Sequence, residues 1–233
     1  MITIKNHNNF INETLCAVIP AKGKSGRLPN KNILDFHGNP LIVHKIKQLQ
    51  NVKKIDEIIV SSDSDEILEL AKKNGCTAIK RPTRFTLDEV NISEFFSYIG
   101  DVIKHDNMLW ACCTSPTVDE GIYNEAISSF EKNVPENYDS LITTYRFQHY
   151  LFDEDGPFNF DIGENHKYSQ NLPHFDLFTN GAIISPLKKV SDWKSNFGSN
   201  PYRLELDQYY SLDIDTKTDF DIARLLYGEK KLK

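Results

Sequence analysis

Short apolar runs alternate with helix-forming segments along most of this chain, and this alternation limits the folds that it can adopt. Five runs have the length and residue types of buried strands: 15–20, 57–62, 76–79, 108–113 and 139–144. Residue spacing and cap signals predict helices between them, over 40–50, 65–74, 92–105 and 119–132. Such alternation is typical of an α/β fold, in which helices cover both faces of a mostly parallel sheet. Thr218 or Asp219 is expected to cap a last helix.

Length and composition favour one domain. The chain has 233 residues, of which 39% are hydrophobic, so we expect a single core and a single domain over 1–233. No apolar stretch approaches the roughly 18–20 residues that a membrane helix needs. The segment Met1–Thr14 is polar and lacks the apolar core of a signal peptide. We therefore expect a cytoplasmic protein with no membrane partner.

Positive charge is concentrated in one loop, although the net charge of −6 argues against nucleic-acid binding, which needs an extended basic face. The loop follows the first expected strand and contains Gly23 and Gly26, which let the backbone approach a ligand closely. Its basic side chains are Lys22, Lys24, Arg27 and Lys31. Because open α/β sheets bind ligands at the carboxyl ends of their strands, the loop indicates a site for a small anion such as a phosphate chain. The alternative is a solvated surface loop.

This loop matches neither common glycine fingerprint. A dinucleotide-binding turn needs G-x-G-x-x-G, and the segment has only G-x-x-G. A P-loop needs a glycine where Val18 stands. The sequence therefore indicates an anion site of another kind.

A pair of carboxylates, Asp213 and Asp215, brackets Ile214 near the C-terminus. Alternate residues of an extended segment point the same way, so both carboxylates are expected on one side with Ile214 packed behind them. Mg²⁺ is usually held by one or two carboxylates together with waters and phosphate oxygens. The pair therefore indicates a Mg²⁺ site, and the alternative is an acidic cluster that favours the following helix through its dipole.

Residues 145–180 interrupt the alternation of strands and helices. This stretch is aromatic and contains histidines, and it is too rich in bulky groups for a disordered linker. It is either a long loop packed on its own side chains or a projecting segment whose apolar groups are covered by a second subunit.

Short motifs recur in order along nearly the whole chain. The basic loop closes with Pro29-Asn30-Lys31-Asn32. The later segments are Ile59-Val60-Ser61-Ser62-Asp63, Arg81-Pro82, Thr114-Ser115-Pro116, Asn180-Gly181-Ala182-Ile183 and Asp213-Ile214-Asp215-Thr216. Their order and spacing resemble those of the CMP-sialic acid synthetase (acylneuraminate cytidylyltransferase) family.

The resemblance implies a Rossmann-like nucleotidyltransferase sheet, with 145–180 as the dimerisation insert of a homodimer. It also implies an enzyme that joins CMP from CTP to an acidic sugar, a sialic acid-like nonulosonate, for surface glycan synthesis. A hydroxyl of the sugar attacks the α-phosphate of CTP and pyrophosphate leaves, with Mg²⁺ as the cofactor.

The resemblance further implies roles for residues at matching positions. The catalytic residues are expected to be Lys31, Lys22, Asp213 and Asp215, and the two aspartates are the expected metal ligands. The nucleotide-binding set is Ala21, Lys22, Gly23, Ser25, Lys31, Asn32 and Arg81. The acceptor-binding set is Thr114, Ser115, Gln170 and Asn180.

The chain departs from the family pattern in its loop and around the Thr-Ser-Pro motif. The family usually has arginine at Lys22, lysine at Gly26 and a Gln-Pro pair at Cys112-Cys113, and Leu-Arg often stands at Thr117-Val118. Lysine keeps the charge of arginine but loses its bidentate fork. Two alternatives stay open: a cytidylyltransferase for another acid such as Kdo, or an inactive nucleotide-binding homologue. Kdo enzymes typically carry Gln-Gly-Asp-Glu-Pro where this chain has Cys112 to Pro116.

Overall fold

The computed structural model describes residues 13–231 except 88 and 135. Residues 1–12, which make up most of the segment in which we expected no signal peptide, lie outside this description. Within the described residues, no helix is long and apolar enough to cross a membrane.

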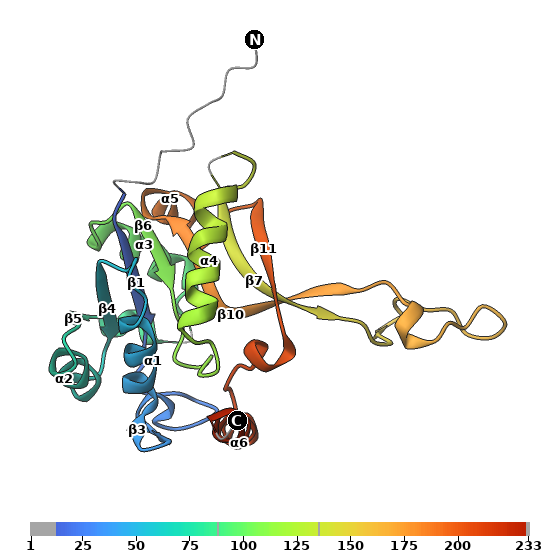
Figure 1. Cartoon of the computed structure of the whole chain (residues 1–233), viewed down its shortest axis with the longest axis horizontal. Helices are drawn as coiled ribbons and strands as arrows, with labels where there is room; N and C mark the ends of the chain where they lie inside the picture. The colour runs from blue at the N-terminus through green and yellow to red at the C-terminus, as the bar shows by residue number, and fades with distance from the viewer. Residues whose placement is uncertain (1–12, 88, 135, 232–233) are drawn as a thin grey trace, which may run out of the picture.

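A seven-stranded sheet forms the centre of the molecule (Figure 1). Its strands, in spatial order, are β11 (Pro201–Leu206), β7 (Ser140–Phe147), β10 (Phe175–Pro186), β6 (Asn107–Trp110), β1 (Leu15–Pro20), β4 (Glu57–Ser62) and β5 (Thr77–Lys80). Strand β10 runs antiparallel to both of its neighbours, and every other pairing is parallel. The expected mostly parallel sheet is confirmed.

Helices cover both faces of this sheet, as predicted. One face is covered by α1 (Leu41–Gln50), α2 (Asp65–Lys73) and α4 (Glu120–Asn133), and the other by α3 (Ile92–Val102) and α5 (Leu187–Trp193). The last helix, α6 (Lys217–Lys231), adds Phe220 and Ala223 to the first core from beyond the ends of the strands (Figure 1). Successive residues of β1 alternate between the two cores, so Ala17 and Ile19 face the first set of helices while Cys16 and Val18 face the second.

Several element boundaries were wrong. The predicted strand over 108–113 ends at Trp110, because the chain then turns into the loop that carries Thr114. The helix predicted over 92–105 ends at Val102. The strands β10 and β11 and the helix α5 were not predicted, and the first half of β10 fell in the segment that we assigned to the insert.

The cap of the last helix was also misplaced. Helix α6 begins at Lys217, so Thr218 and Asp219 both lie in its first turn. Thr216 stands in front of the helix, and Asp219 accepts hydrogen bonds from the Thr216 backbone and hydroxyl while its own N–H donates to the Thr216 hydroxyl. Asp219, rather than Asp213 or Asp215, therefore stabilises the start of this helix.

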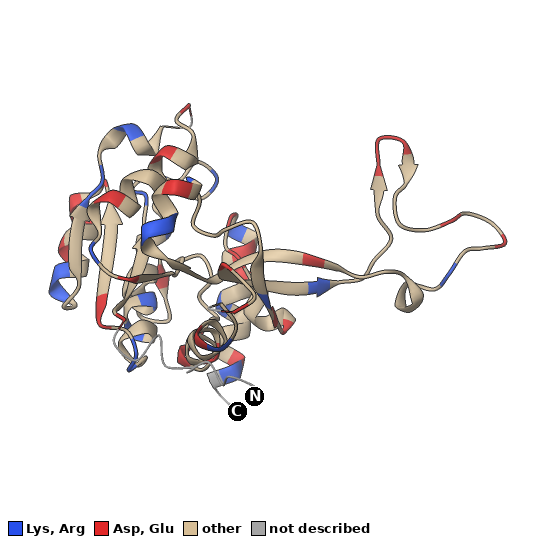
Figure 2. Ribbon diagram, turned by 90° about the horizontal axis from the view of Figure 1, so that it is seen from above, with Lys and Arg blue, Asp and Glu red and all other residues tan. Residues whose placement is uncertain are grey.

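Residues between β7 and β10 form an arm that stands away from the sheet (Figure 1). The outer halves of the two strands pair as a ribbon, with Phe147 opposite Phe175. The distal end divides into the small hairpin of β8 (Phe152–Asp153) and β9 (Gly156–Pro157) and a second loop (Figure 2). The 3₁₀ turn η3 (Ser169–Asn171) precedes the return strand.

Candidate active site

The basic loop is pressed against the start of α2 at the carboxyl edge of the sheet. A side chain at Gly23 would place its Cβ 2.8 Å from Cβ of Ser64, which only glycine avoids. The Gly23 N–H donates to Asp63 Oδ1 at 2.8 Å. This amide is therefore used within the protein, and Gly23 serves the close approach of two segments rather than offering a donor to phosphate.

Two further members of the expected nucleotide-binding set shape the loop from within. Ala21 is fully buried, and its N–H donates to Ser61 O on the neighbouring strand at 3.0 Å. Asn32 is buried as well, and its side-chain amide donates to Lys22 O at 2.9 Å. These contacts fix the path of the backbone between the first strand and the 3₁₀ turn η1 (Lys31–Ile33).

Lys31 connects the loop to the carboxylate pair. Its Nζ donates to Ile214 O at 2.6 Å and lies 3.5 Å from Asp215 Oδ1. Arg27 forms a closer ion pair with the same carboxylate oxygen, at 2.8 Å. Ile214 is completely buried between the two aspartates, as predicted, whereas the placing of both carboxylates on one side stays a prediction.

A shallow basic hollow of about 380 Å³ opens beside these contacts. It is lined by the four cations of the loop together with Ser25, Gly26 and Asp215. Four cations around one hollow hold an anion of several charges, because their fields add where water is partly excluded. The local concentration of charge predicted from the sequence is confirmed here.

A larger pocket of about 580 Å³ adjoins the basic hollow and shares Lys22, Ser25 and Lys31 with it. Arg81 lies at its base, 3% exposed, with its guanidinium 3.9 Å from the centre of the Phe95 ring. Arg81 donates from Nη2 to Ser61 O, while its buried Nε has no hydrogen-bond partner among the described residues. Burial lowers the Arg81 pKa to about 10, which leaves the guanidinium charged at neutral pH. An unpaired N–H on a buried cation is a donor available to a ligand.

Asn180 of β10 lines this pocket and joins it to a distant segment. Asn180 donates from Nδ2 to Asp213 Oδ2 at 2.8 Å. The other oxygen of that carboxylate, Oδ1, is buried and has no hydrogen-bond partner among the described residues. Cys112 lines the same pocket, and burial, aided by the charge of Asp213, raises its thiol pKa to about 12, so it is an uncharged thiol.

The acceptor set predicted from the sequence is only partly brought together. Thr114 and Asn180 line the pocket. Ser115 is 1% exposed and its carbonyl accepts a hydrogen bond from Lys45, so its side chain does not face this pocket. Gln170 lies in η3 on the arm, where its carbonyl accepts from Gln148. Within one chain, Gln170 is therefore not part of this site.

The carboxylate pair is the place to test whether the residues fit the expected Mg²⁺. No group of three or more His, Cys, Asp or Glu side chains that could hold a metal ion gathers among the described residues. Asp215 nevertheless lines the basic hollow, and Asp213 keeps one buried oxygen without a hydrogen-bond partner among the described residues; carboxylate oxygens of this kind are ligands that a hard divalent cation prefers. The residues therefore fit Mg²⁺ only if phosphate oxygens and water supply the remaining ligands.

Sequence reasoning missed the aromatic wall of the pocket. The rings of Phe95, Phe96, Trp110, Phe178 and Phe197 line it from α3, the end of β6, β10 and the segment after α5. The adjacent pair Phe95-Phe96 on a predicted helix was the local signal for this wall. Two successive residues of a helix cannot both lie at the centre of its core-facing stripe, so one of the two rings was available to line a pocket. The others come from segments that only the tertiary fold brings together.

A mostly parallel α/β sheet, with a basic loop after its first strand and a carboxylate beside that loop, is the arrangement of a nucleotidyltransferase. Comparison with known proteins makes the class specific: residues 16–231 match the model of the cytidylyltransferase family. The chain belongs to this family and is a CTP-using enzyme, so the resemblance found in its sequence is confirmed.

Curated relatives and solved structures agree with this assignment. A pseudaminic acid cytidylyltransferase of Campylobacter jejuni is 30% identical over 232 residues, covering 92% of this chain and 96% of that protein. An N-acylneuraminate cytidylyltransferase of Streptococcus agalactiae is 28% identical over 87% of this chain and 51% of that protein. The solved structure of a CMP:2-keto-3-deoxy-manno-octonic acid synthetase complexed with CTP superposes with a TM-score of 0.68, and the match covers 93% of this chain and 99% of the synthetase chain. The two sequences are 14% identical, so this match shows a shared fold.

Proposed function

We propose that this enzyme, acting as one catalytic domain in the cytoplasm, transfers CMP from CTP to a sialic acid-like nonulosonate for surface glycan synthesis. The observation that carries the proposal is the continuity of the two cavities, which share Lys22, Ser25 and Lys31. One cavity suits a polyphosphate, and the other is large enough for a nucleoside and a sugar. Relatives named for pseudaminic acid and N-acylneuraminate support an acidic sugar as the acceptor.

In the proposed mechanism the protein binds and orients both substrates for direct displacement at phosphorus. Lys22, Lys31 and Arg27 hold the triphosphate and neutralise the charge that moves onto the departing pyrophosphate. Arg81 uses its free Nε–H beside the nucleoside. When bound, Mg²⁺ supplies charge neutralisation at the phosphates, and Asp213 and Asp215 are the residues that hold it. Asn180 orients Asp213 toward the reacting groups.

Pyrophosphate release tests this function against its two alternatives. We expect rapid release when the protein is given CTP and a nonulosonate, and none when either is omitted. In the presence of CTP, release with Kdo but with no nonulosonate would assign the chain to the other acceptor class. No release with any acid, although CTP binds, would identify an inactive homologue.

The pocket wall predicts the acceptor preference. A glutamine amide both donates and accepts hydrogen bonds, and Cys112 in its place lines the pocket as an uncharged thiol among aromatic rings. A hydroxyl-rich acceptor left with an unpaired buried group loses about 1–3 kcal/mol. We therefore expect a higher kcat/KM for a less hydroxylated or differently substituted acid, such as pseudaminate or legionaminate, than for N-acetylneuraminate or Kdo. A preference for N-acetylneuraminate would show that Cys112 does not set specificity.

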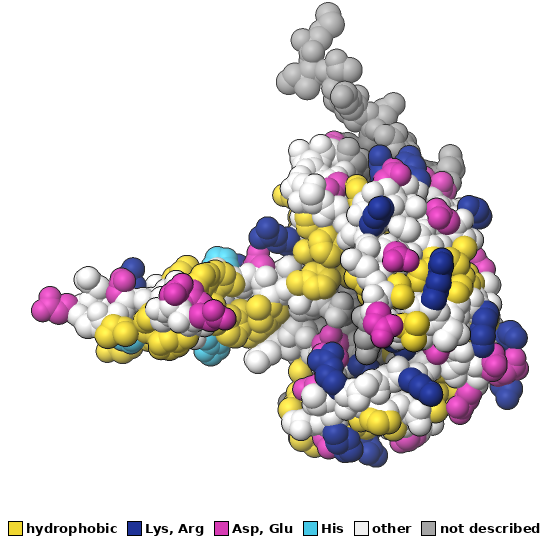
Figure 3. Space-filling view, turned by 180° about the vertical axis from the view of Figure 1, so that it is seen from behind, with side chains coloured by type: hydrophobic (Ala, Val, Ile, Leu, Met, Phe, Trp, Pro, Cys, Tyr) yellow, Lys and Arg dark blue, Asp and Glu magenta, His cyan; other side chains and the backbone are white. Residues whose placement is uncertain are grey.

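The arm predicts the assembly state. Apolar side chains gather along it (Figure 3), and Phe152, Phe158, Ile162 and Tyr168 are all more than half exposed. Exposed apolar surface of this kind calls for cover, and one self-complementary patch closes on itself under twofold symmetry. We propose that the arm forms a homodimer and expect light scattering at micromolar concentration to report about twice 26.8 kDa.

A charge placed on the arm provides the matched test. Ile162→Asp is expected to weaken the dimer, whereas Leu225→Asp, on the equally exposed outer side of α6, is expected to leave it intact. If Ile162→Asp and the wild type give the same mass at every concentration, the arm is not the interface. In that case the arm would not bring Gln170 to the active site of a second subunit.

A further inference from the structure

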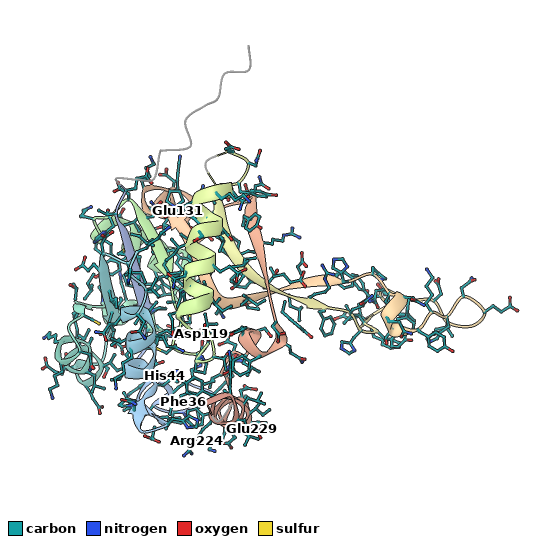
Figure 4. The ribbon with its side chains drawn as sticks, viewed as in Figure 1. Phe36, His44, Asp119, Glu131, Arg224 and Glu229 are labelled. Carbon is teal, nitrogen blue, oxygen red and sulfur yellow. The ribbon has the colours of Figure 1, made fainter. Side chains whose placement is uncertain are left out.

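Helix α1 points three buried polar side chains at one loop behind the active site. His44 Nε2 and Gln48 Nε2 both lie within hydrogen-bond distance of Pro116 O, at 2.9 and 2.8 Å. Lys45 Nζ donates to Ser115 O at 2.9 Å and to Val118 O at 3.0 Å. Figure 4 labels His44 on α1 close to Asp119, the residue that caps α4 directly after this loop. One helix thus holds the carbonyl oxygens of three residues of this loop, Ser115, Pro116 and Val118.

Lys45 is the central member of this set. It is fully buried, and its third partner is the Tyr123 hydroxyl at 2.7 Å. Burial lowers the Lys45 pKa from 10.5 to about 7, while Cys113, Cys112 and Asp119 raise it by less. The partners suit both forms of the amine: an ammonium donates to all three oxygens, and a neutral amine donates to the two carbonyls and accepts from Tyr123. Burial raises the pKa of Tyr123, so its hydroxyl keeps the proton that this needs.

The clamped loop is connected to the catalytic segment by backbone contacts. Thr114, one residue before the clamp, lines the pocket and accepts a hydrogen bond from Ile214 N at 2.8 Å. The Ile214 carbonyl in turn accepts from Lys31 Nζ at 2.6 Å. A shift of the loop therefore displaces Ile214, the residue between the two aspartates, and so changes its distance from Lys31.

We propose that Lys45 is a positioning residue, which sets the spacing between Lys31 and the Asp213 segment by fixing the carbonyls of the loop after Thr114. This inference rests on the proposed function for its kinetic consequence. The arrangement predicts that loss of the clamp damages turnover more than nucleotide binding, because the hydrogen bonds of Lys45 go to Ser115, Val118 and Tyr123 and not to the nucleotide-binding residues.

The kinetic test compares Lys45→Met with Leu49→Ala. Both side chains are fully buried on α1, but Leu49 contributes only to the apolar core. Since small misplacements of reacting groups cost up to about a hundredfold, we expect Lys45→Met to lower kcat by on the order of tenfold or more, with the Kd for CTP changed by less than about threefold. Leu49→Ala is expected to lower the melting temperature while leaving kcat below that temperature unchanged. Equal effects of the two variants on kcat, or a parallel loss of CTP affinity in Lys45→Met, would overturn the proposal.

Hydrogen exchange supplies a readout that does not depend on activity. In Lys45→Met we expect faster exchange in the peptides that contain Val118 and Ile214, whose amides donate to Ser115 O and Thr114 O. Leu49→Ala is expected to leave the Ile214 peptide unchanged relative to the rest of the sheet. If exchange responds as expected but the wild type releases no pyrophosphate, the clamp stands and the proposed function fails. If Ile214 exchange is unchanged, the positioning role fails whatever the activity.

Milder variants cover the case in which Lys45→Met does not fold. Tyr123→Phe removes only the hydroxyl partner of Lys45, and Gln48→Leu removes only one of the two contacts to Pro116. Each is expected to lower kcat by a smaller factor than Lys45→Met, again with the Kd for CTP preserved. Wild-type kcat and wild-type Ile214 exchange in both variants would overturn the proposal.

Discussion

Replacing Lys31 with alanine is expected to lower turnover by on the order of 100-fold or more while the protein stays folded. The side chain of Lys31 is only 13% exposed, so its charge acts on a bound triphosphate with little screening by water. Negative charge builds on the departing pyrophosphate as the bond to it breaks, so the attraction between this charge and Lys31 is strongest in the transition state. Steady-state pyrophosphate release measures the loss of turnover, and thermal unfolding shows whether the variant is folded.

Lys24→Ala is the matched control. Lys24 lines the same basic hollow but is exposed, so the same loss of charge is screened and is expected to lower turnover by less than about fivefold. Wild-type turnover in a folded Lys31→Ala protein would remove Lys31 from the catalytic set. Equal losses in both variants would show that the hollow acts through its total charge rather than through the contact between Lys31 and Ile214.

Asp213→Asn is expected to produce the second large effect, a loss of turnover on the order of 100-fold. The substitution keeps the shape of the side chain and leaves an oxygen that can still accept from Asn180, but it removes the negative charge from the buried position now held by the unpaired Oδ1. We expect the Mg²⁺ concentration that gives half-maximal activity to rise, with partial rescue by high Mg²⁺ or by Mn²⁺. A titration of activity against each metal measures both effects.

Asp215→Asn and Asp221→Asn complete the series. Asp215 is 38% exposed and already pairs with Arg27, so its replacement is expected to cost activity, but less than that of Asp213. Asp221 pairs with Lys217 on the outer side of α6, and its replacement is expected to leave activity unchanged. Excess EDTA is expected to abolish wild-type activity. Full activity in EDTA would exclude the metal role of both aspartates.

Local patterns were sufficient to predict the strands that build the centre of the sheet. The predicted limits of the first two strands, 15–20 and 57–62, match β1 and β4, since a short run rich in apolar residues is typical of a strand buried on both faces. The basic loop and the burial of Ile214 between Asp213 and Asp215 were also predictable. The loop directly follows the first strand, and successive residues of an extended segment point in opposite directions.

Strand β10 shows where local patterns were insufficient. Its inner half is buried in the sheet while its outer half, from Phe175, belongs to the arm, so a single strand carries two different burial patterns with a register shift between Thr179 and Ile183. The sequence alone favoured an insert that ended at 180. Only the position of β10 between β6 and β7 reveals it as a member of the sheet.

The sequence by itself determined the chemistry available to this protein, namely a cluster of cations after the first strand and a pair of carboxylates near the end. The tertiary structure alone decided which groups meet. Lys31 reaches a carbonyl 183 residues away, Asn180 pairs with Asp213, and Lys45 holds a loop about 70 residues along the chain. The physical reason is that residue type and spacing determine how one segment folds, whereas contacts between segments depend on strand order and helix packing, which no local pattern contains.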